Sequence, residues 1–441
     1  MTFDLWFEQM QILTKNWDKI NPLDINTYIQ QGGYESLRKV IRKMSPQDVI
    51  GEVKKSGLAG RGGAGFPTAD KWEISAKINS DEKFFICNLD ESEPGAFKDR
   101  VIAEKNPHQI IEGIVIGAYA IGAKKGFIYI NGRYQKQAEI LNVAIDQARV
   151  KEFLGQGIIG SAVDFDLEIF EGAGAYICGE ETALINTIEG KRGEPRVRPP
   201  YPPCSGLFGR PTVVNNAETL ANVPYIIKRG GKVYSEIGSK VSPGTKLFCL
   251  TGAVRNRGVI EAPLGITPQE LIFNSLYGGG MDNGKEFWFA QIGGSSGRLM
   301  PTGKLDQPLV YGCDSEYPLG SGAIMVVDKS ADIKDLLYSW ADFFHRESCG
   351  KCVPCREGTY QLWEIAKRLR NNDLRLRDKK NIDDILWTLS STTFCPFGNF
   401  AATAWRDAID MFDKEIFGQS LRTTDFSTNY ESLTNIRMNE D

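Results

Sequence analysis

The sequence predicts an α/β domain over residues 1–240, a smaller α+β module over 241–330 and a helical region over 331–420. Strand-like and helical segments alternate between residues 84 and 235, a pattern typical of folds with a mainly parallel sheet. A hairpin-like pattern begins near Ser242, and from Ala331 onward the apolar residues recur only at helical spacing. The remaining residues, 421–441, are polar, and we expect an extended or mobile tail there.

The first domain opens with an arm and two predicted helices. Leu37 and Val40 lie at helical spacing and mark the first helix. The second begins at Ser45, because a serine cap is followed by proline in the first turn and by an acid three residues after the cap, and Gly57 closes it. Further strands are expected at 84–87, 126–130, 166–170 and 212–214, and further helices at 108–123, 134–149 and 182–189.

The smaller module and the helical region show different patterns. In the module we expect a hairpin formed by 247–251 and 259–261, a short helix at 267–273, and strands at 287–292 and 323–327. In the helical region, apolar stripes at 333–344, 362–369, 382–389 and 405–416 predict four helices packed as a bundle.

Composition excludes several classes of function. The chain has 441 residues and a formal net charge of -4, so it offers no basic domain for nucleic acid. No apolar run approaches the roughly 20 residues needed to span a bilayer, and the first residues lack the features of a signal peptide. We therefore expect a cytoplasmic protein without direct membrane insertion. Because the chain has only 2 histidines, chemistry that needs several imidazoles is disfavoured.

The 9 cysteines fall into two groups. Five are scattered, and each is expected to be a small buried hydrophobic residue: Cys87, Cys178, Cys204, Cys249 and Cys313. The other four are Cys349, Cys352 and Cys355, spaced C-x2-C-x2-C, and Cys395, which precedes a proline. This arrangement is typical of a [4Fe–4S] cluster. The alternative is a structural zinc ion in which His345 replaces one cysteine.

A glycine-rich loop lies early in the chain. Gly60, Gly62 and Gly65 form G-x-G-x-x-G, but the preceding segment is predicted to be helical, so the usual strand context of a dinucleotide-binding loop is missing. Glycines still allow backbone N–H groups to approach a phosphate, and Arg61 and Lys71 add positive charge. The alternative is a tight loop without a ligand.

Carboxylates follow two of the predicted strands. Asn88, Asp90 and Glu93 follow the strand that begins at Phe84, and in open α/β sheets ligands bind at this carboxyl edge. Such groups suit hydroxyl-rich ligands such as ribose or a ribityl chain, although a solvated acidic turn is the alternative. Glu180 and Glu181 lie near the start of a helix, where the helix dipole stabilises negative charge.

Two further segments carry candidate ligand contacts. The loop 196–203 is basic and rich in proline, so it is either a polyproline linker or the rim of a pocket to which Arg198 and Tyr201 contribute. Asn215 and Asn216 follow a predicted strand, and their amides suit a flat heterocycle.

Six motifs occur in one order, at residues 57–68, 88–95, 179–184, 199–202, 215–219 and 347–359. In this order they resemble the NADH-binding, FMN- and [4Fe–4S]-containing subunit of respiratory complex I and the related soluble diaphorase subunits. The resemblance covers approximately residues 30 to 420. It implies an atypical, non-standard Rossmann α/β domain that binds flavin, a β-grasp-like domain of the soluble-ligand-binding type, and a four-helix bundle that carries the cluster.

The resemblance also implies specific site residues. For FMN they are Gly60, Arg61, Gly62, Lys71, Asn88, Asp90, Tyr176, Gly179, Asn215, Asn216 and Thr219. For NADH they are Phe66, Glu93, Glu180, Glu181, Arg198 and Tyr201. For the [4Fe–4S] cluster they are Cys349, Cys352, Cys355 and Cys395.

The implied activity is hydride transfer from NADH to FMN, then single-electron transfer to the cluster and on to partner subunits. The flavin carries the chemistry, so no catalytic side chain is required, although Glu93 and Tyr176 are expected nearby. The expected partners are a thioredoxin-like [2Fe–2S] subunit and a larger iron–sulfur subunit, in a complex peripheral to the inner face of the plasma membrane. Glu93 and Glu181 should repel the extra phosphate of NADPH, so we expect a preference for NADH.

Two alternatives remain at this stage. One is the diaphorase subunit of a soluble NAD-dependent hydrogenase, formate dehydrogenase or electron-bifurcating complex, and the other is a zinc-stabilised binding module without flavin chemistry. The chain departs from the family pattern at Arg198, where lysine is common, and at Ile74, where some members carry an aromatic residue. It also shows neither a thioredoxin-like nor a cysteine-rich ferredoxin extension, which favours the form found in complex I.

Overall fold

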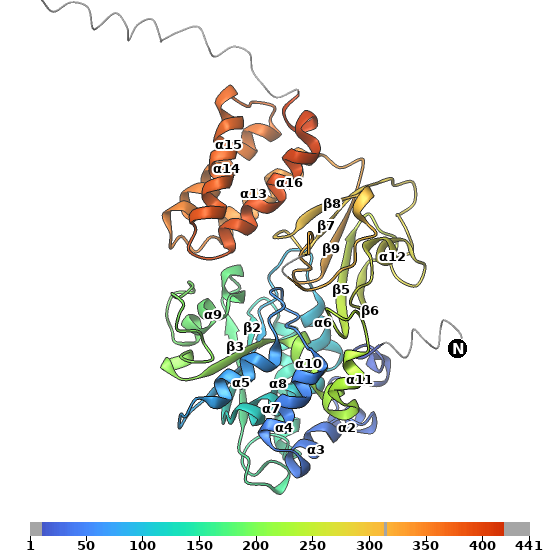
Figure 1. Cartoon of the computed structure of the whole chain (residues 1–441), viewed down its shortest axis with the longest axis vertical. Coiled ribbons are helices and arrows are strands. Elements are labelled where there is room, and N and C mark those ends of the chain that lie inside the picture. Colours follow the sequence, from blue (N-terminus) through green and yellow to red (C-terminus); the bar gives the residue numbers. More distant parts are fainter. Residues whose placement is uncertain (1–10, 313–314, 419–441) are drawn as a thin grey trace, which may run out of the picture. The chain divides into compact units, whose positions relative to one another are not determined.

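The computed structural model describes residues 11–312 and 315–418, and it divides the chain into two compact units, 1–330 and 331–441 (Figure 1). The predicted tail at 421–441 and Cys313 lie outside the described residues.

The first unit contains a four-stranded, fully parallel sheet. Its strands are β1 (Phe84–Leu89), β2 (Lys125–Asn131), β3 (Asp166–Gly172) and β4 (Thr212–Asn216), in the order β3-β2-β1-β4. Strands of parallel sheets are covered on both faces and therefore consist of nearly continuous apolar runs, as β1 does. The predicted mixed α/β fold with a parallel sheet is confirmed. From β1 the chain first adds β2 and β3 on one side and then β4 on the other, so the strand order reverses between β1 and β4. Open α/β sheets usually bind ligands at the carboxyl ends of the strands at such a position.

Helices surround this sheet. They are α2 (Ile25–Gln30), α3 (Glu35–Lys43), α4 (Pro46–Ser56), α5 (Thr68–Lys77), α6 (Lys98–Lys105), α7 (Pro107–Ile121), α8 (Gln135–Val150), α9 (Glu181–Ile188), α10 (Ala217–Arg229) and α11 (Gly231–Ser235). Helices α4, α7 and α10 lie side by side in Figure 1 and contact one another. Gly113 makes the close approach of α7 and α10 possible, because a Cβ atom there would lie 2.0 Å from the carbonyl oxygen of Leu220.

The ends of α4 follow the predicted pattern. Ser45 and Asp48 form a capping box at its start, and Gly57 ends it in the left-handed conformation with φ of 65°. Helices α5, α6 and α10 were not expected from the sequence. Helix α6 is mostly charged, and α10 carries Pro224 in its interior, which weakens a helical pattern because proline lacks the N–H donor.

A second sheet lies in the same unit. Its strands are β5 (Thr245–Gly252), β6 (Gly258–Pro263), β7 (Phe287–Ile292), β8 (Arg298–Pro301) and β9 (Ala323–Asp328), in the order β6-β5-β9-β7-β8, and it is accompanied by α12 (Pro268–Phe273). The predicted hairpin is confirmed, since β5 and β6 pair antiparallel. Strand β8, which was not expected, is only four residues long. A separate apolar cluster that includes Phe248, Leu250 and Ile292 forms the core of this part.

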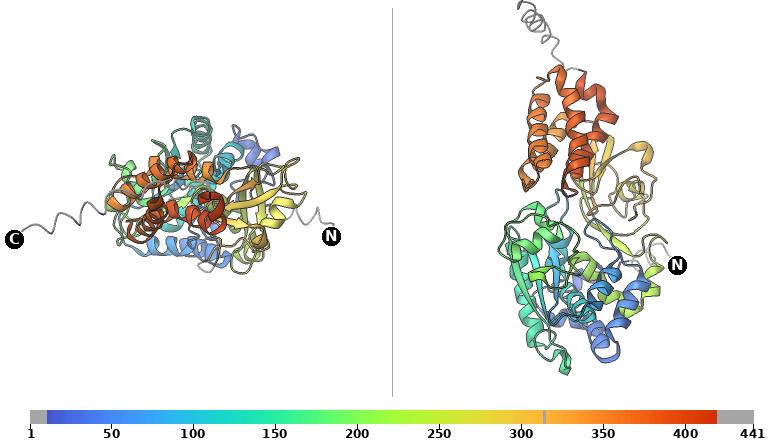
Figure 2. Two further views of the ribbon diagram at one scale, coloured as in Figure 1. Left: turned by 90° about the horizontal axis from the view of Figure 1, so that it is seen from above. Right: turned by 60° about the vertical axis from the view of Figure 1, so that its left-hand side comes forward.

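The second unit is helical throughout its described residues. It contains α13 (Ile333–Glu347), α14 (Val353–Arg370), α15 (Leu376–Thr392) and α16 (Phe397–Phe417). Consecutive helices pack against each other, and α13 also contacts α16 (Figure 2). Leu337, Leu362, Leu389 and Trp405 from the four apolar stripes are buried. In neither unit does a described helix combine the length and the apolar composition that crossing a membrane requires.

Candidate functional site

The glycine-rich loop joins α4 to α5. As expected, it does not follow a strand, so it lacks the strand–loop–helix arrangement of a standard dinucleotide-binding loop. Its two ends meet, because the backbone N–H of Gly60 donates to the carbonyl of Phe66 at 2.8 Å. The backbone N–H of Arg61 donates to Oγ1 of Thr219 at 2.8 Å, which ties the loop to the first turn of α10. A Cβ atom at Gly62 would lie 3.0 Å from Cβ of Asn216, so the loop lies directly against the end of β4.

The side chain of Arg61 corrects one expectation. It is fully buried and donates to the carbonyls of Ala59 (2.9 Å), Pro243 (2.7 Å) and Thr245 (3.1 Å) and to the hydroxyl of Tyr234 (3.0 Å). Four of the five guanidinium donors are therefore used inside the protein. The predicted use of this charge for a phosphate is not what the structure shows, since the guanidinium instead anchors the glycine loop to the strand that begins at Thr245.

Amide side chains meet at the carboxyl edge between β1 and β4. Asn88 lies opposite Asn216 in the parallel register. Asn88 donates to the carbonyl of Gly179 at 2.9 Å, and Asn215 accepts a hydrogen bond of 2.8 Å from the indole of Trp72. Asn216 caps α10 through its oxygen. The structure thus brings these predicted residues together, and their amides also join the surrounding elements.

A buried charge network lies beneath Asn216. Nδ2 of Asn216 donates to Oδ2 of Asp99 at 2.7 Å, and Asp99 pairs with Lys98 at 2.7 Å. Lys98 also pairs with Glu218 at 3.1 Å, and Glu218 pairs with Lys246 on β5. Because the network joins three segments that are far apart in the chain, at 98–99, 216–218 and 246, the sequence offered no signal for it. The network fixes the orientation of the Asn216 amide.

Glu91, in the predicted acidic segment that follows β1, is hydrogen-bonded to the same network. Its carboxylate accepts hydrogen bonds from the backbone N–H groups of Asp99 (3.0 Å) and Arg100 (3.2 Å) at the start of α6. Burial, reinforced by the nearby charge of Asp99 and opposed by Lys98, raises the pKa of Glu91 to about 7. Asp90 accepts a hydrogen bond of 3.0 Å from the hydroxyl of Ser92.

Two predicted cations pair with two predicted carboxylates. Nζ of Lys71 lies 2.8 Å from Oε2 of Glu181 and also donates to the carbonyl of Val214 at 3.1 Å. Arg198 lies 3.8 Å from Glu181 and 3.6 Å from Glu180. Glu180 also caps α9, since it accepts hydrogen bonds from the first backbone N–H groups of that helix. Glu180 therefore has the structural role expected at the start of a helix and also faces Arg198, whereas Glu181 pairs with both cations.

Two aromatic rings accompany these charges. The side chains of Phe66 and Tyr201 are 50% and 55% exposed. Lys71 lies 5.9 Å from the ring centre of Phe66, and Arg198 lies 6.0 Å from that of Tyr201. Such exposed rings beside cations offer flat faces to a heterocycle. Ile74, where some relatives carry an aromatic residue, is itself largely exposed.

The proline-rich loop is folded back on itself. The backbone N–H of Cys204 donates to the carbonyl of Tyr201 at 2.8 Å, and that of Thr212 donates to the carbonyl of Pro202 at 2.9 Å. It is therefore a packed turn, and the alternative of a polyproline linker is wrong. This turn places Cys204 on the surface, so the expectation that Cys204 is buried is also wrong. Cys87, Cys178 and Cys249 are buried as predicted.

Glu93 is held by residues of both sheets. The hydroxyl of Tyr176, in the 3-10 helix η3 (Tyr176–Gly179), donates to Oε2 of Glu93 at 2.7 Å. Ser296, in the loop between β7 and β8, donates its backbone N–H at 3.1 Å and its hydroxyl at 3.0 Å to the same carboxylate. Burial raises the pKa of Glu93, while the hydrogen bonds from Tyr176 and Ser296 lower it. Ser296 was not expected at this site, and the only signal for it in the sequence was the run of glycine and serine at 293–297.

The four clustered cysteines lie in the second unit. Cys349 and Cys352 lie between α13 and α14, Cys355 is in the first turn of α14, and Cys395 precedes α16. Burial raises the pKa of the Cys355 thiol to about 12, a hydrogen bond with Ser348 lowers it, and the other three cysteines each raise it. The four thiols are therefore close enough to interact.

The spacing of these thiols bears on the choice between zinc and a cluster. Within residues 11–312 and 315–418, no three histidine, cysteine or acidic side chains converge tightly enough for a single metal ion. Zinc needs four ligands at about 2.0–2.3 Å from one centre. A [4Fe–4S] cluster gives four cysteines four separate irons, so its ligands are spread more widely. His345 stacks on the ring of Trp363 at 4.7 Å between ring centres. The choice between zinc and a cluster follows from the family comparison below, which matches residues 335–418 to an iron-sulfur binding region.

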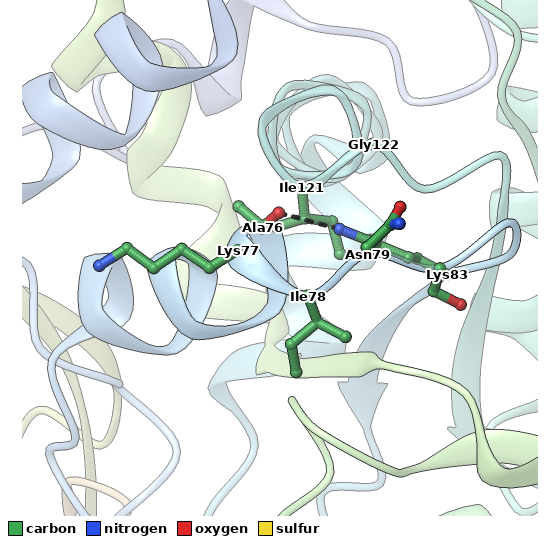
Figure 3. Close-up of a pocket in the computed structure, with 8 residues that line it drawn as sticks. Ala76, Lys77, Ile78, Asn79, Lys83, Ile121 and Gly122 are labelled. Atoms are coloured by element: carbon green, nitrogen blue, oxygen red, sulfur yellow. Dashed lines mark hydrogen bonds between the residues drawn. The ribbon is translucent and has the colours of Figure 1, made fainter.

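One cavity lies away from these residues. A cavity of about 430 Å³ is lined by Ala76, Lys77, Ile78, Asn79, Ser80, Lys83, Ile121 and Gly122 (Figure 3). Lys83 immediately precedes β1 and donates to the carbonyl of Ala76 at 3.1 Å, as Figure 3 shows. This cavity is therefore at the amino edge of the sheet, opposite the edge that carries the candidate ligand residues.

Comparison with known proteins decides the family. Residues 53–225 match the Nuo51 FMN-binding domain, and residues 335–418 match the NADH-ubiquinone oxidoreductase-F iron-sulfur binding region. The chain is 41% identical over 406 residues to the F 2 subunit of the NADH-quinone oxidoreductase of Rhizobium meliloti (strain 1021), a match that covers 92% of this chain and 96% of that relative. The chain belongs to this family of NADH oxidoreductase flavin subunits.

Two further matches come from hydrogenases. The NADP-reducing hydrogenase subunit HndC of Solidesulfovibrio fructosivorans is 42% identical over 412 residues, which cover 92% of this chain and 83% of the relative. A crystal structure of NAD⁺-reducing [NiFe]-hydrogenase in the air-oxidized state matches with a TM-score of 0.81 and 34% identity, over 95% of this chain and 68% of that chain. As a family member, the protein is an oxidoreductase with FMN and a [4Fe–4S] cluster, and NADH is its substrate.

The residues present fit both cofactors. At the flavin edge, the loop from Gly60 to Gly63 carries only one side chain, that of Arg61, which is buried. The ammonium group of Lys71 lies 5.9 Å from the ring centre of Phe66, at the end of this loop. Backbone N–H groups beside a cation suit a phosphate. In the second unit, four interacting thiols suit a four-iron cluster.

Proposed function

We propose that FMN is held at the carboxyl edge between β1 and β4, and that NADH binds beside it against Glu93, Glu181 and Arg198. One observation carries this proposal. The glycine loop, the Asn88 amide of β1 and the Asn216 amide of β4 meet at the position where the strand order reverses. Open α/β sheets bind their ligands at such positions.

When bound, FMN takes a hydride from NADH and the cluster takes electrons one at a time. The protein residues then have binding and orienting tasks only. Backbone N–H groups of the glycine loop and the ammonium group of Lys71 suit the FMN phosphate. The exposed faces of Phe66 and Tyr201 suit the rings of the dinucleotide. No nucleophilic side chain is needed.

The carboxylates suit NADH better than NADPH. Glu181 faces Arg198, so it occupies a cation that a 2′-phosphate would otherwise contact. A second carboxylate, Glu180, lies 3.6 Å from Arg198. Negative charge at this position repels an extra phosphate. We therefore propose that the chain prefers NADH, with Glu181 as the main determinant.

The layout proposed for the chain has three folded parts and a tail. The flavin part is 1–240, and the β-grasp-like part of the soluble-ligand-binding type is 241–330. Two separate sheets with separate apolar clusters support this division. The part at 331–420 is a four-helix bundle that carries the cluster, which is supported by four mutually packed helices and the interacting thiols. The tail is 421–441.

The relatives are named as subunits, so we propose that this chain also works within a larger complex. The partners would be a thioredoxin-like [2Fe–2S] subunit and a larger iron–sulfur subunit, with the complex peripheral to the inner face of the plasma membrane. A diaphorase role in a soluble hydrogenase is the second candidate, favoured by the similarity to the NAD⁺-reducing hydrogenase. Identifying the subunits that co-purify with this chain separates the two candidates.

Loss of FMN on substitution of Lys71 tests the proposed site. We expect Lys71→Ala to retain the broad iron–sulfur absorption and to lose most of the flavin absorption. Lys77→Ala is the matched control, because Lys77 lies on the same helix but pairs with Glu73 on the exposed face. Equal flavin content in both variants would place the cofactor elsewhere.

A further inference from the structure

The loop between β7 and β8 is shaped around one carboxylate of the other sheet. Glu93 follows β1, whereas Ser296 lies between strands of the five-stranded sheet, 203 residues later in the chain. Ser296 gives two hydrogen bonds to Glu93, one from its backbone N–H at 3.1 Å and one from its hydroxyl at 3.0 Å. Tyr176 supplies a third donor at 2.7 Å. The backbone of Ser295 adds a further donor, so donors from two distant segments converge on one side chain.

Gly294 shows how closely the loop follows this carboxylate. A Cβ atom at Gly294 would lie 2.4 Å from Cγ of Glu93, so no other residue fits there without moving the carboxylate. Its φ of +88° is also a backbone conformation that favours glycine. Both features place Ser296, two residues later, where its N–H reaches Oε1 and its hydroxyl reaches Oε2 of the same carboxylate.

The same module touches the glycine loop at two further points. A Cβ atom at Gly65 would lie 2.7 Å from the ring of Tyr311, and the guanidinium of Arg61 lies 5.6 Å from the centre of that ring. Gly320 approaches Gly63, with its carbonyl carbon 3.9 Å from the position of a Cβ atom there. Gly294 and Ser296 thus contact the predicted dinucleotide carboxylate, and Tyr311 and Gly320 contact the predicted phosphate loop.

We propose that Ser296 is a positioning residue for NADH, which acts by holding the Glu93 carboxylate in one orientation. This inference rests on the proposed function, in which Glu93 contacts the dinucleotide. Ser296 and Tyr176 give three hydrogen bonds to this carboxylate, and the backbone of the neighbouring Ser295 gives a further one. These donors fix the orientation of the carboxylate and favour its charged form, so Glu93 presents its negative charge to the ligand in one place.

The competing explanation is that Ser296 only fastens the two sheets together. In that case its removal would lower the thermal stability without changing the binding of the dinucleotide. The two explanations also differ in pH dependence. Donors to a carboxylate favour its ionised form, so the loss of the Ser296 hydroxyl must raise the pKa of Glu93 further above its ordinary range.

The test uses the full-length holoprotein and the variants Ser296→Ala, Ser296→Thr and Ser321→Ala. Thr keeps the hydroxyl, and Ser321 is a matched control because its hydroxyl faces the carbonyl of Gly293 rather than Glu93. Measurements are the Kd for NAD⁺ by calorimetry, KM and kcat for NADH against pH, FMN content and Tm. We expect Ser296→Ala to raise Kd and KM about tenfold with kcat and FMN content retained, and to shift the acid limb of the KM profile to higher pH.

The conservative and control variants complete the test. Ser296→Thr should restore both Kd and the pH profile, and Ser321→Ala should resemble the unmodified protein. An unchanged Kd and pH profile in Ser296→Ala, with or without a lower Tm, would overturn the inference. If Ser296→Ala does not fold, Tyr176→Phe removes another donor to the same carboxylate, and an unchanged Kd in that variant would also overturn it. Failure of the proposed function itself would appear differently, as the absence of NAD⁺ binding or NADH oxidation in the unmodified holoprotein.

Discussion

The ammonium group of Lys71 lies 2.8 Å from Oε2 of Glu181, so a residue expected at the flavin phosphate is paired with one expected at the dinucleotide. Glu181 also lies 3.8 Å from Arg198. Both side chains of the Lys71–Glu181 pair are mostly shielded from solvent, with 17% and 20% exposure. Their interaction is therefore less screened than that of a surface ion pair. A single carboxylate thus forms ion pairs with two cations near the proposed dinucleotide site.

The Glu181→Gln variant should use NADPH better. Removal of this negative charge ends the repulsion of a 2′-phosphate and releases Arg198 to bind it. We expect the ratio of kcat/KM for NADPH to that for NADH to rise at least about tenfold, equivalent to about 1.4 kcal/mol. Steady-state kinetics with both coenzymes measure this ratio. Glu171→Gln removes an exposed carboxylate at the end of β3 and should leave the ratio unchanged, and an equal ratio in the two variants would contradict the assignment.

The Arg61→Lys variant should lose stability as well as cofactor. Lysine cannot make the four hydrogen bonds that the buried guanidinium donates, so at least one buried carbonyl loses its partner. We expect the free energy of unfolding to fall by about 2–4 kcal/mol. Thermal unfolding of the apoprotein measures the loss, with the exposed Arg42→Lys as control. A variant that loses FMN but keeps the Tm of the unmodified apoprotein would show that Arg61 serves the phosphate after all.

Much of the fold was predictable because the relevant signals are local. The strands of the parallel sheet are short apolar runs, and the ends of α4 carry a capping box and a glycine. Helix α10 was missed because Pro224 interrupts its pattern, although tertiary packing holds the helix together. The turn at Cys204 was missed because its fold depends on hydrogen bonds to residues on both sides of it.

The site was only partly predictable, because its contacts are distant in the chain. The residue types at Asn88 and Asn216 suggested ligand contacts, but their adjacency depends on the register of β1 and β4. The anchoring of Arg61 involves the carbonyl of Pro243, 182 residues away. No periodicity or spacing rule indicates such a contact, so the guanidinium was assigned to a phosphate on its charge alone.

The Cys395→Ser variant should separate the two halves of the proposed electron path. Loss of one thiolate ligand should prevent assembly of the [4Fe–4S] cluster. The flavin part contains none of the four cysteines, so reduction of FMN by NADH should continue. Iron content, stopped-flow flavin bleaching and electron delivery to co-purified partner subunits are measured together. Cys204→Ser, at an exposed cysteine outside this group, should retain all three. A cluster of normal iron content in Cys395→Ser would contradict the ligand assignment.

The stability of the first unit should depend on His108 at acid pH. His108 is fully buried in α7, where its Nδ1 lies 3.0 Å from the hydroxyl of Tyr34. Burial lowers the pKa of His108 from 6.5 to about 4. Between these two pH values the unfolded chain binds a proton that the folded chain does not, so stability falls as pH falls from about 6.5 to about 4. The full effect is about 3 kcal/mol at the acid end.

Replacement of His108 by glutamine removes this proton linkage. His108→Gln should be less stable than the unmodified protein at pH 7, because the buried packing and the contact with Tyr34 change, but the deficit should shrink towards pH 4. Urea midpoints of the apoprotein at several pH values measure the deficit. His345→Gln, at a histidine that is only partly buried, provides the comparison. Buried acids such as Glu112 affect all variants alike, so they cancel in the difference. A deficit that stays constant between pH 7 and pH 4 would mean that His108 takes up its proton equally in the folded and unfolded chain.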